Sequence, residues 1–181
     1  MWALVESGSV TQVYNRPRSL TIGDVSYPSN IFTMWSKSEL EALGIYEVEI
    51  DNSNYKDPEY YNNSNSTIVF SNGQVTESWQ TAVENNLEEE KVKKKKTIKR
   101  QASSLLTSTD WYVIKASEVT EYSIPTNISN FRTSIRTKSD EMETAIDAAG
   151  SISALKTLYT YTNDGNGNVT RPLGEWPEEV A

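Results

Sequence analysis

Short runs of alternating apolar and polar residues fill the first 80 positions of the chain. β-branched and aromatic residues recur a few at a time, and Gly, Asn and Pro separate the runs, which is typical of strands joined by tight turns. Hairpin turns are predicted at three places, namely Ser7-Gly8-Ser9, Gly23-Asp24 and Asn72-Gly73.

One short helix is predicted within this β-rich part. Ser36 is a candidate N-cap, Glu39 stands where a capping box requires an acidic residue, and Gly44 is suited to end the helix. Residues 45–50 alternate like a strand. Residues 51–66 are rich in Asn, Ser, Asp and Tyr, which predicts a surface loop.

The pattern changes after residue 80, because glycine and proline are then absent until Pro125. From Val83 to Leu106 acidic residues precede basic ones beside a narrow apolar stripe, which predicts a charged helix. A second helix is predicted at 127–149, with Thr126 or Asn127 as its cap. Its apolar residues recur every seven positions, at Ile128, Ile135, Met142 and Ala149.

These patterns together predict an α+β fold. We expect a small β-rich N-terminal domain with one short helix at residues 1–80, followed by a helical hairpin or short coiled coil at 81–162. The hairpin includes a further helical turn or two at 151–159. The remainder, 163–181, is predicted to be a flexible turn and an extended tail. Because the apolar stripes are narrow, they are expected to meet each other or a neighbouring chain, which makes the heptad residues a candidate oligomer seam and favours a homo-oligomer.

Composition narrows the possible functions. The 181 residues carry a net charge of -8 and include neither cysteine nor histidine. Disulfides, thiolate metal sites, thiol nucleophiles and the common general base are therefore absent. Asp and Glu show no fixed catalytic or metal-binding spacing. We predict a protein that is not an enzyme and has no cofactor or metal.

Charge and hydropathy also bear on partners. The acidic surface argues against wholesale binding of nucleic acid, and no apolar run approaches membrane length or resembles a signal peptide. Synthesis in a reducing cytoplasm is the simplest expectation. The basic run 91–100 follows three glutamates and lacks interleaved aromatics, which favours a solvated helix face over a docking surface for an acidic partner.

The chain is rich in large aromatic residues, with five tryptophans and ten tyrosines. Trp35 is predicted to lie in the core, near Ile31 and Phe32. Candidate aromatic contact residues near predicted edges and the tail are Trp2, Trp79 and Trp176, with ordinary packing as the alternative. A receptor- or glycan-binding surface in the β-rich half predicts solvent exposure of Trp2, Tyr14, Tyr60 and Tyr61.

One motif joins the two predicted helices. Thr109 or Asp110 can cap a turn and Trp111 can pack where the helices meet, while Arg132 and Arg136 lie one turn apart and are able to hold a carboxylate such as that of Asp110. Two interpretations remain, a structural corner and a direct partner-binding site. The candidate interaction or corner residues are Asp110, Trp111, Phe131, Arg132 and Arg136.

The same motif carries a resemblance to a known group of proteins. Leu105-Leu106, Thr109-Asp110-Trp111, Pro125 and the segment 130–136 resemble the C-terminal region of tail-fibre assembly proteins and related tail-associated proteins of tailed phages. Phe131 stands where tyrosine is usual, and the chain continues into a long heptad helix. The stretch that includes Tyr27-Pro28, Ile31-Phe32, Trp35-Ser36, Glu39-Leu40 and Gly44-Ile45-Tyr46 is similar to the opening of virion-associated proteins of marine phages, particularly cyanophages.

The resemblance implies a function in the particle. It indicates a virion structural protein on a tail fibre or baseplate, acting as adaptor, tip or decoration through protein–protein contacts. A tail-fibre assembly chaperone is the alternative, and a receptor- or glycan-binding tip is a third.

Overall fold

The computed structural model describes residues 1–178, and the chain divides into two compact units between Val83 and Glu84. The fold is mixed α+β, which confirms the predicted class. Residues 179–181, the end of the predicted tail, lie outside the described residues.

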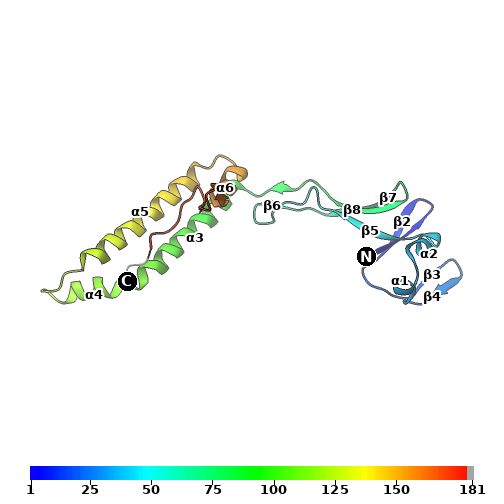
Figure 1. The fold of residues 1–181 in the computed structure, drawn as a ribbon, viewed down its shortest axis with the longest axis horizontal. Helices are drawn as coiled ribbons and strands as arrows, with labels where there is room; N and C mark the ends of the chain where they lie inside the picture. Colours follow the sequence, from blue (N-terminus) through cyan, green and yellow to red (C-terminus); the bar gives the residue numbers. More distant parts are fainter. Residues whose placement is uncertain (179–181) are drawn as a thin grey trace. The chain divides into compact units, whose positions relative to one another are not determined.

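A five-stranded sheet organises the first unit (Figure 1). The strand order is β2-β1-β5-β8-β7, in which β5 and β8 are parallel and the other neighbours are antiparallel. Two smaller sheets pair β3 with β4 and β6 with β9. The elements are β1 (Trp2–Glu6), β2 (Ser9–Tyr14), β3 (Leu20–Ile22), β4 (Val25–Tyr27), α1 (Ile31–Met34), α2 (Lys37–Ala42), β5 (Ile45–Asp51), β6 (Tyr61–Asn62), β7 (Ser66–Ser71), β8 (Gln74–Trp79) and β9 (Val83–Glu84).

The three predicted hairpins are confirmed, and the backbone shows why. Asn72 and Gly73 have φ of 53° and 77°, the pair of positive values that a tight two-residue turn with the sheet's own twist requires. Ser7 and Gly8 adopt the same geometry, with φ of 51° and 78°. Local turn chemistry therefore fixes these strand pairs.

The predicted capping box is present at the start of α2. The backbone N–H of Ser36 donates to the Glu39 carboxylate at 2.7 Å, and the Ser36 hydroxyl accepts from the Glu39 N–H at 3.4 Å. Gly44 follows the helix with φ of 81°. The one-turn helix α1 was not predicted. The surface loop expected at 51–66 is wrong in part, because it contains β6 and because Tyr60 is only 2% exposed.

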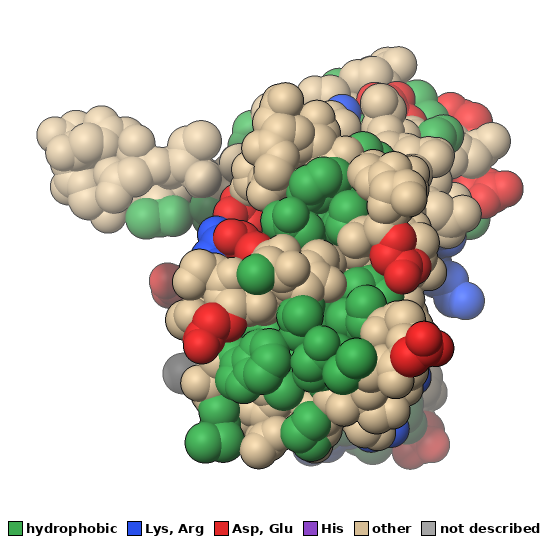
Figure 2. All heavy atoms as spheres, turned by 90° about the vertical axis from the view of Figure 1, so that its right-hand side faces the viewer, with side chains coloured by type: hydrophobic (Ala, Val, Ile, Leu, Met, Phe, Trp, Pro, Cys, Tyr) green, Lys and Arg blue, Asp and Glu red, His purple; other side chains and the backbone are tan. Residues whose placement is uncertain are grey.

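Apolar side chains pack on both faces of the sheet. One cluster includes Leu4, Tyr14, Phe32 and Ile45, and the other is centred on Val75. The prediction that Trp35 lies in the core is wrong, because its side chain is 37% exposed and touches Tyr27 edge-on. Figure 2 shows apolar side chains gathered in patches on the face it draws, with carboxylates beside them.

Two long helices form the body of the second unit, in which α3 and α5 run side by side (Figure 1). The helix expected from Val83 begins instead at Leu87, because Val83 belongs to β9 and the Asn86 side chain caps the helix by accepting from the Glu89 N–H. Pro125, rather than Thr126 or Asn127, occupies the N-cap of α5. The elements are α3 (Leu87–Thr107), α4 (Asp110–Glu118), α5 (Thr126–Ala148), α6 (Ile152–Tyr159), β10 (Thr162–Asn163) and β11 (Val169–Thr170).

The C-terminal segment is attached to the helices. The Leu173 side chain is 3% exposed, and its N–H donates to the Leu158 carbonyl oxygen at 3.0 Å. Trp176 packs on the apolar cluster between α3 and α5, and its indole donates to Gln101 at 3.2 Å. The expected turn at 163–168 is framed by the β10–β11 hairpin. The expectation of a simple extended tail is therefore corrected.

Candidate functional site

Arg132 organises the corner where α3 ends, α4 begins and α5 passes. Its side chain is 9% exposed and donates to the Leu106 carbonyl oxygen at 3.0 Å and to the Thr109 hydroxyl at 2.6 Å. The guanidinium also forms an ion pair with Asp110 at 2.9 Å. A cation is favourable here because the last carbonyls of α3 carry the negative end of the helix dipole. The predicted bond between an arginine and Asp110 is therefore present.

The other arginine of the motif has a different environment. Arg136 is exposed, and its guanidinium makes one long hydrogen bond of 3.4 Å, to the Arg132 carbonyl oxygen. The prediction that both arginines hold Asp110 is wrong for Arg136, since only Arg132 does so in the described structure. The Arg136 guanidinium thus retains donors for another group.

The two aromatic residues of the motif lie in opposite environments. Phe131 is 4% exposed and packs with Ala102 and Ile135, so it belongs to the core between α3 and α5. Trp111 is 50% exposed and stacks on Tyr112 with ring centroids 3.9 Å apart. The expectation that Trp111 packs where the helices meet is therefore wrong.

The helix α4 contributes an apolar surface that sequence reasoning missed. It has nine residues, and none of them is buried. Val113 and Ile114 are 40% and 56% exposed. A usable signal was available, since no helix-breaking residue stands between 81 and 124 and Asp110 opens an apolar run. The β-branched and aromatic residues in that run have low helix propensity, so the run did not predict a helix.

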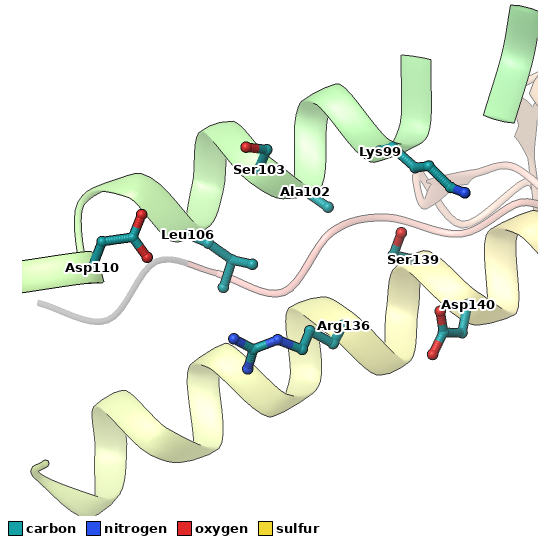
Figure 3. Close-up of a pocket in the computed structure, with 8 residues that line it drawn as sticks. All are labelled: Lys99, Ala102, Ser103, Leu106, Asp110, Arg136, Ser139 and Asp140. Carbon is teal, nitrogen blue, oxygen red and sulfur yellow. The ribbon is translucent and has the colours of Figure 1, made fainter. Parts of the chain in front are cut away.

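An open groove of about 410 Å³ lies beside this corner, between α3 and α5 (Figure 3). Ala102 and Leu106 supply an apolar side, while Arg136 and Asp140 project from α5. The remaining lining side chains are Lys99, Ser103, Asp110 and Ser139. Mixed charges around an apolar strip suit a polypeptide better than a small ion.

The predicted oligomer seam is used inside the chain. Ile128, Ile135, Met142 and Ala149 are 6%, 0%, 0% and 6% exposed. The heptad pattern is therefore the buried face of α5, and the interpretation of these residues as a contact surface for a second chain is wrong. A stripe that one neighbouring helix fills leaves nothing for another chain to cover.

The basic run of α3 faces α5 rather than open solvent alone. Lys95 pairs with Asp147 at 2.6 Å and Lys99 with Glu143 at 3.2 Å, while Lys91 is 8% exposed and donates to the Asp147 carbonyl oxygen at 3.2 Å. The hydrogen bond to Asp147 raises the pKa of Lys95 above its usual value. The predicted solvated face is corrected for Lys91 and Lys95, which lie against α5, whereas the Lys99 side chain is 68% exposed.

The candidate aromatic contacts are half-buried and make contacts within the chain. Trp2 packs on Phe32, Trp79 packs on Tyr55, and Trp176 lies against the helices. Tyr14 and Tyr60 are each 2% exposed, contrary to the exposure that a glycan-binding surface at those residues requires.

No group of three or more potential metal ligands occurs among residues 1–178. In the same part of the chain, no helix is both long and apolar enough to cross a membrane. Comparison of the chain with protein-family models, with curated proteins and with solved structures finds no match.

Proposed function

We propose that this chain is a structural component of a tailed-phage virion. It is attached to a tail fibre or to the baseplate as adaptor, tip or decoration, and it acts through protein–protein contacts without enzymatic activity. In this proposal a small β-rich N-terminal part is followed by a helical hairpin that carries the attachment surface. The resemblance of Asp110-Trp111 and the segment 130–136 to tail-associated phage proteins supports it.

The observation that carries the proposal is the exposure of α4. A nine-residue helix is marginal in water unless packing stabilises it, yet no residue of α4 is buried. Trp111 and Ile114 are 50% and 56% exposed, and tryptophan is prominent among the residues that dominate protein interfaces. A partner that covers α4 buries this apolar area and stabilises the helix.

Charge beside α4 indicates what the partner segment contains. Arg136 lines the adjoining groove and retains donors, whereas the neighbouring Arg132 is already bound to Asp110. A guanidinium is well suited to bind a carboxylate through two parallel hydrogen bonds. The partner is therefore proposed to present an apolar segment followed by an acidic side chain.

Mass spectrometry of purified particles tests the assignment. We expect the chain in particles of its phage at a fixed ratio to fibre or baseplate subunits. Abundance in lysate together with absence from particles overturns the structural role, and leaves a transient assembly chaperone as the function.

A pair of matched variants tests the surface. Ile114→Ser and Val92→Ser each remove an exposed apolar side chain, since Val92 on α3 is 63% exposed. Only Ile114→Ser is expected to lower the copy number in particles. Both variants are expected to keep the free energy of unfolding within about 0.5 kcal/mol of that of the unchanged chain. Equal incorporation of the two variants contradicts the role of α4.

The homo-oligomer expected from the narrow apolar stripes stays a prediction. Because Ile135 and Met142 are fully buried within the chain, any self-association uses other surfaces. Sedimentation of the purified chain measures it directly.

A further inference from the structure

A small cavity in the first unit lies on the face of the sheet that α1 and α2 cover. Strands β1 and β5 place Trp2 directly opposite Glu47, so both side chains stand on the same face. Phe32, Trp35 and Lys37 reach the same cavity from the α1–α2 segment, and its volume is about 240 Å³. Three aromatic side chains thus share one cavity with an acid and a base.

The polar groups around this cavity have unused hydrogen-bonding capacity. The indoles of Trp79 and Trp176 donate to Asn52 at 3.0 Å and to Gln101 at 3.2 Å. By contrast, the indole N–H groups of Trp2 and Trp35 have no acceptor among residues 1–178.

The two charged groups of the cavity are also available to a ligand. The Glu47 carboxylate has no donor or ion-pair partner within the described part of the chain. The Lys37 ammonium is 3.8 Å from Glu41 in an exposed pair, and such a pair is weak. The site therefore offers indole and ammonium donors and a carboxylate acceptor.

We propose that this cavity binds one neutral pyranose ring of a glycan. Its volume suits a single ring, being smaller than the sites of drug-sized ligands. The C–H face of a pyranose stacks on an aromatic ring, and its hydroxyls both donate and accept, which matches Glu47 together with Lys37.

The charges around the cavity favour a neutral ligand over a cation. Aromatic cages that hold quaternary ammonium groups combine rings with negative charge. Here the positive Lys37 lines the same cavity as Glu47, so a bound cation would lie beside an ammonium group as well as a carboxylate.

Saturation-transfer NMR on the full chain tests the site. The probes are the methyl glycosides of glucose, galactose, mannose and N-acetylglucosamine. At least one is expected to bind with a dissociation constant in the millimolar range, and Trp35→Ala is expected to weaken it about ten-fold. The matched control is Tyr161→Ala, which removes a 52% exposed aromatic side chain of the second unit and leaves the affinity unchanged.

A second variant distinguishes binding of a sugar from binding of a cation. Glu47→Gln keeps a hydrogen-bond acceptor and removes the charge, so sugar binding is expected to fall by no more than about three-fold, whereas attraction of a quaternary ammonium depends on the charge. Absence of transfer to all four glycosides, or undiminished binding to Trp35→Ala, overturns the proposal. Tighter binding of choline than of any glycoside, lost in Glu47→Gln, overturns it in favour of a cation site.

Discussion

Replacing Arg132 with methionine tests the corner between α3, α4 and α5. Methionine keeps an unbranched apolar stem and removes the guanidinium, which donates to the Leu106 carbonyl oxygen and to the Thr109 hydroxyl. Each hydrogen bond from a charged donor contributes about 1.5–3 kcal/mol. The ion pair with Asp110 adds less than about 1 kcal/mol, because that side chain is 53% exposed.

The net loss is smaller than the sum of these terms. The Leu106 carbonyl oxygen still accepts from the Thr109 hydroxyl at 2.8 Å, so it does not become unsatisfied. We therefore expect Arg132→Met to lower the free energy of unfolding by about 2–4 kcal/mol. Because the chain has two compact units, amide hydrogen exchange along α3 and α5 is the suitable assay, supported by guanidinium unfolding followed by circular dichroism.

Arg136→Met is the matched control, one turn along the same helix. Its guanidinium is exposed and makes one 3.4 Å bond, so a change of less than about 0.5 kcal/mol is expected. Losses that are equal in the two variants refute the reasoning. So does a loss at Arg132 that is confined to amides of the first unit.

Local geometry predicts the effect of single substitutions at three further positions. Gly44→Ala places a Cβ 2.6 Å from a carbonyl oxygen of β1 at a residue with φ of 81°, so urea unfolding should show a loss of about 2–4 kcal/mol in the free energy of unfolding. Gly8→Ala, where φ is 78° but the added Cβ meets open space, should lose only about 1–2 kcal/mol. Ile135→Ala removes most of a side chain that is 0% exposed and leaves a cavity, so calorimetry should show a loss of about 3–5 kcal/mol in the free energy of unfolding. A loss under about 1 kcal/mol contradicts the packing. Hydrogen bonds from Ser36 lower the pKa of Glu39. The ionised Glu39 side chain therefore stabilises the folded chain fully above the usual carboxyl pKa, and this stabilisation is lost as the pH falls through the lowered pKa. Glu39→Gln should therefore flatten the acid-side decline of the melting temperature, and an unchanged decline would contradict the capping role.

Features that depend on neighbouring residues could be predicted from the sequence. The Asn72-Gly73 hairpin and the Ser36 capping box follow from backbone preferences over four residues, and both are present. The pair Asp110–Arg132 was also predictable, because the two residue types complement each other at a chain reversal. In the first two cases a few adjacent side chains decide the geometry, whereas the Asp110–Arg132 pair joins residues of two different helices.

Features that depend on distant partners could not be predicted in the same way. The parallel pairing of β5 with β8 joins segments on either side of a long connection, and no residue of β5 encodes that choice. The environment of a side chain has the same origin. Trp35 follows buried Phe32 by three residues, yet it is 37% exposed, and its backbone is extended at the end of α1.

The heptad positions show why a correct period did not identify the partner. Ile135 and Met142 recur as a coiled-coil seam does, and the period alone is the same whether the partner helix belongs to this chain or to another. The deciding information lies in the charges of α3. They are spaced to meet acids of α5, and that pairing requires comparison of segments about 50 residues apart.

Those charges favour one orientation of the two helices. Lys95 and Lys99 in the middle of α3 meet Asp147 and Glu143 in the last half of α5, and Arg132 in the first half of α5 meets the carbonyl end of α3. A parallel arrangement would bring the lysines toward Arg132 and separate them from the acids. Each exposed pair is weak, below about 1 kcal/mol, but all of them disfavour the same alternative. Since this pairing fills the apolar stripe of α5 from within the chain, the exposed apolar residues of α4 remain available for a partner to cover.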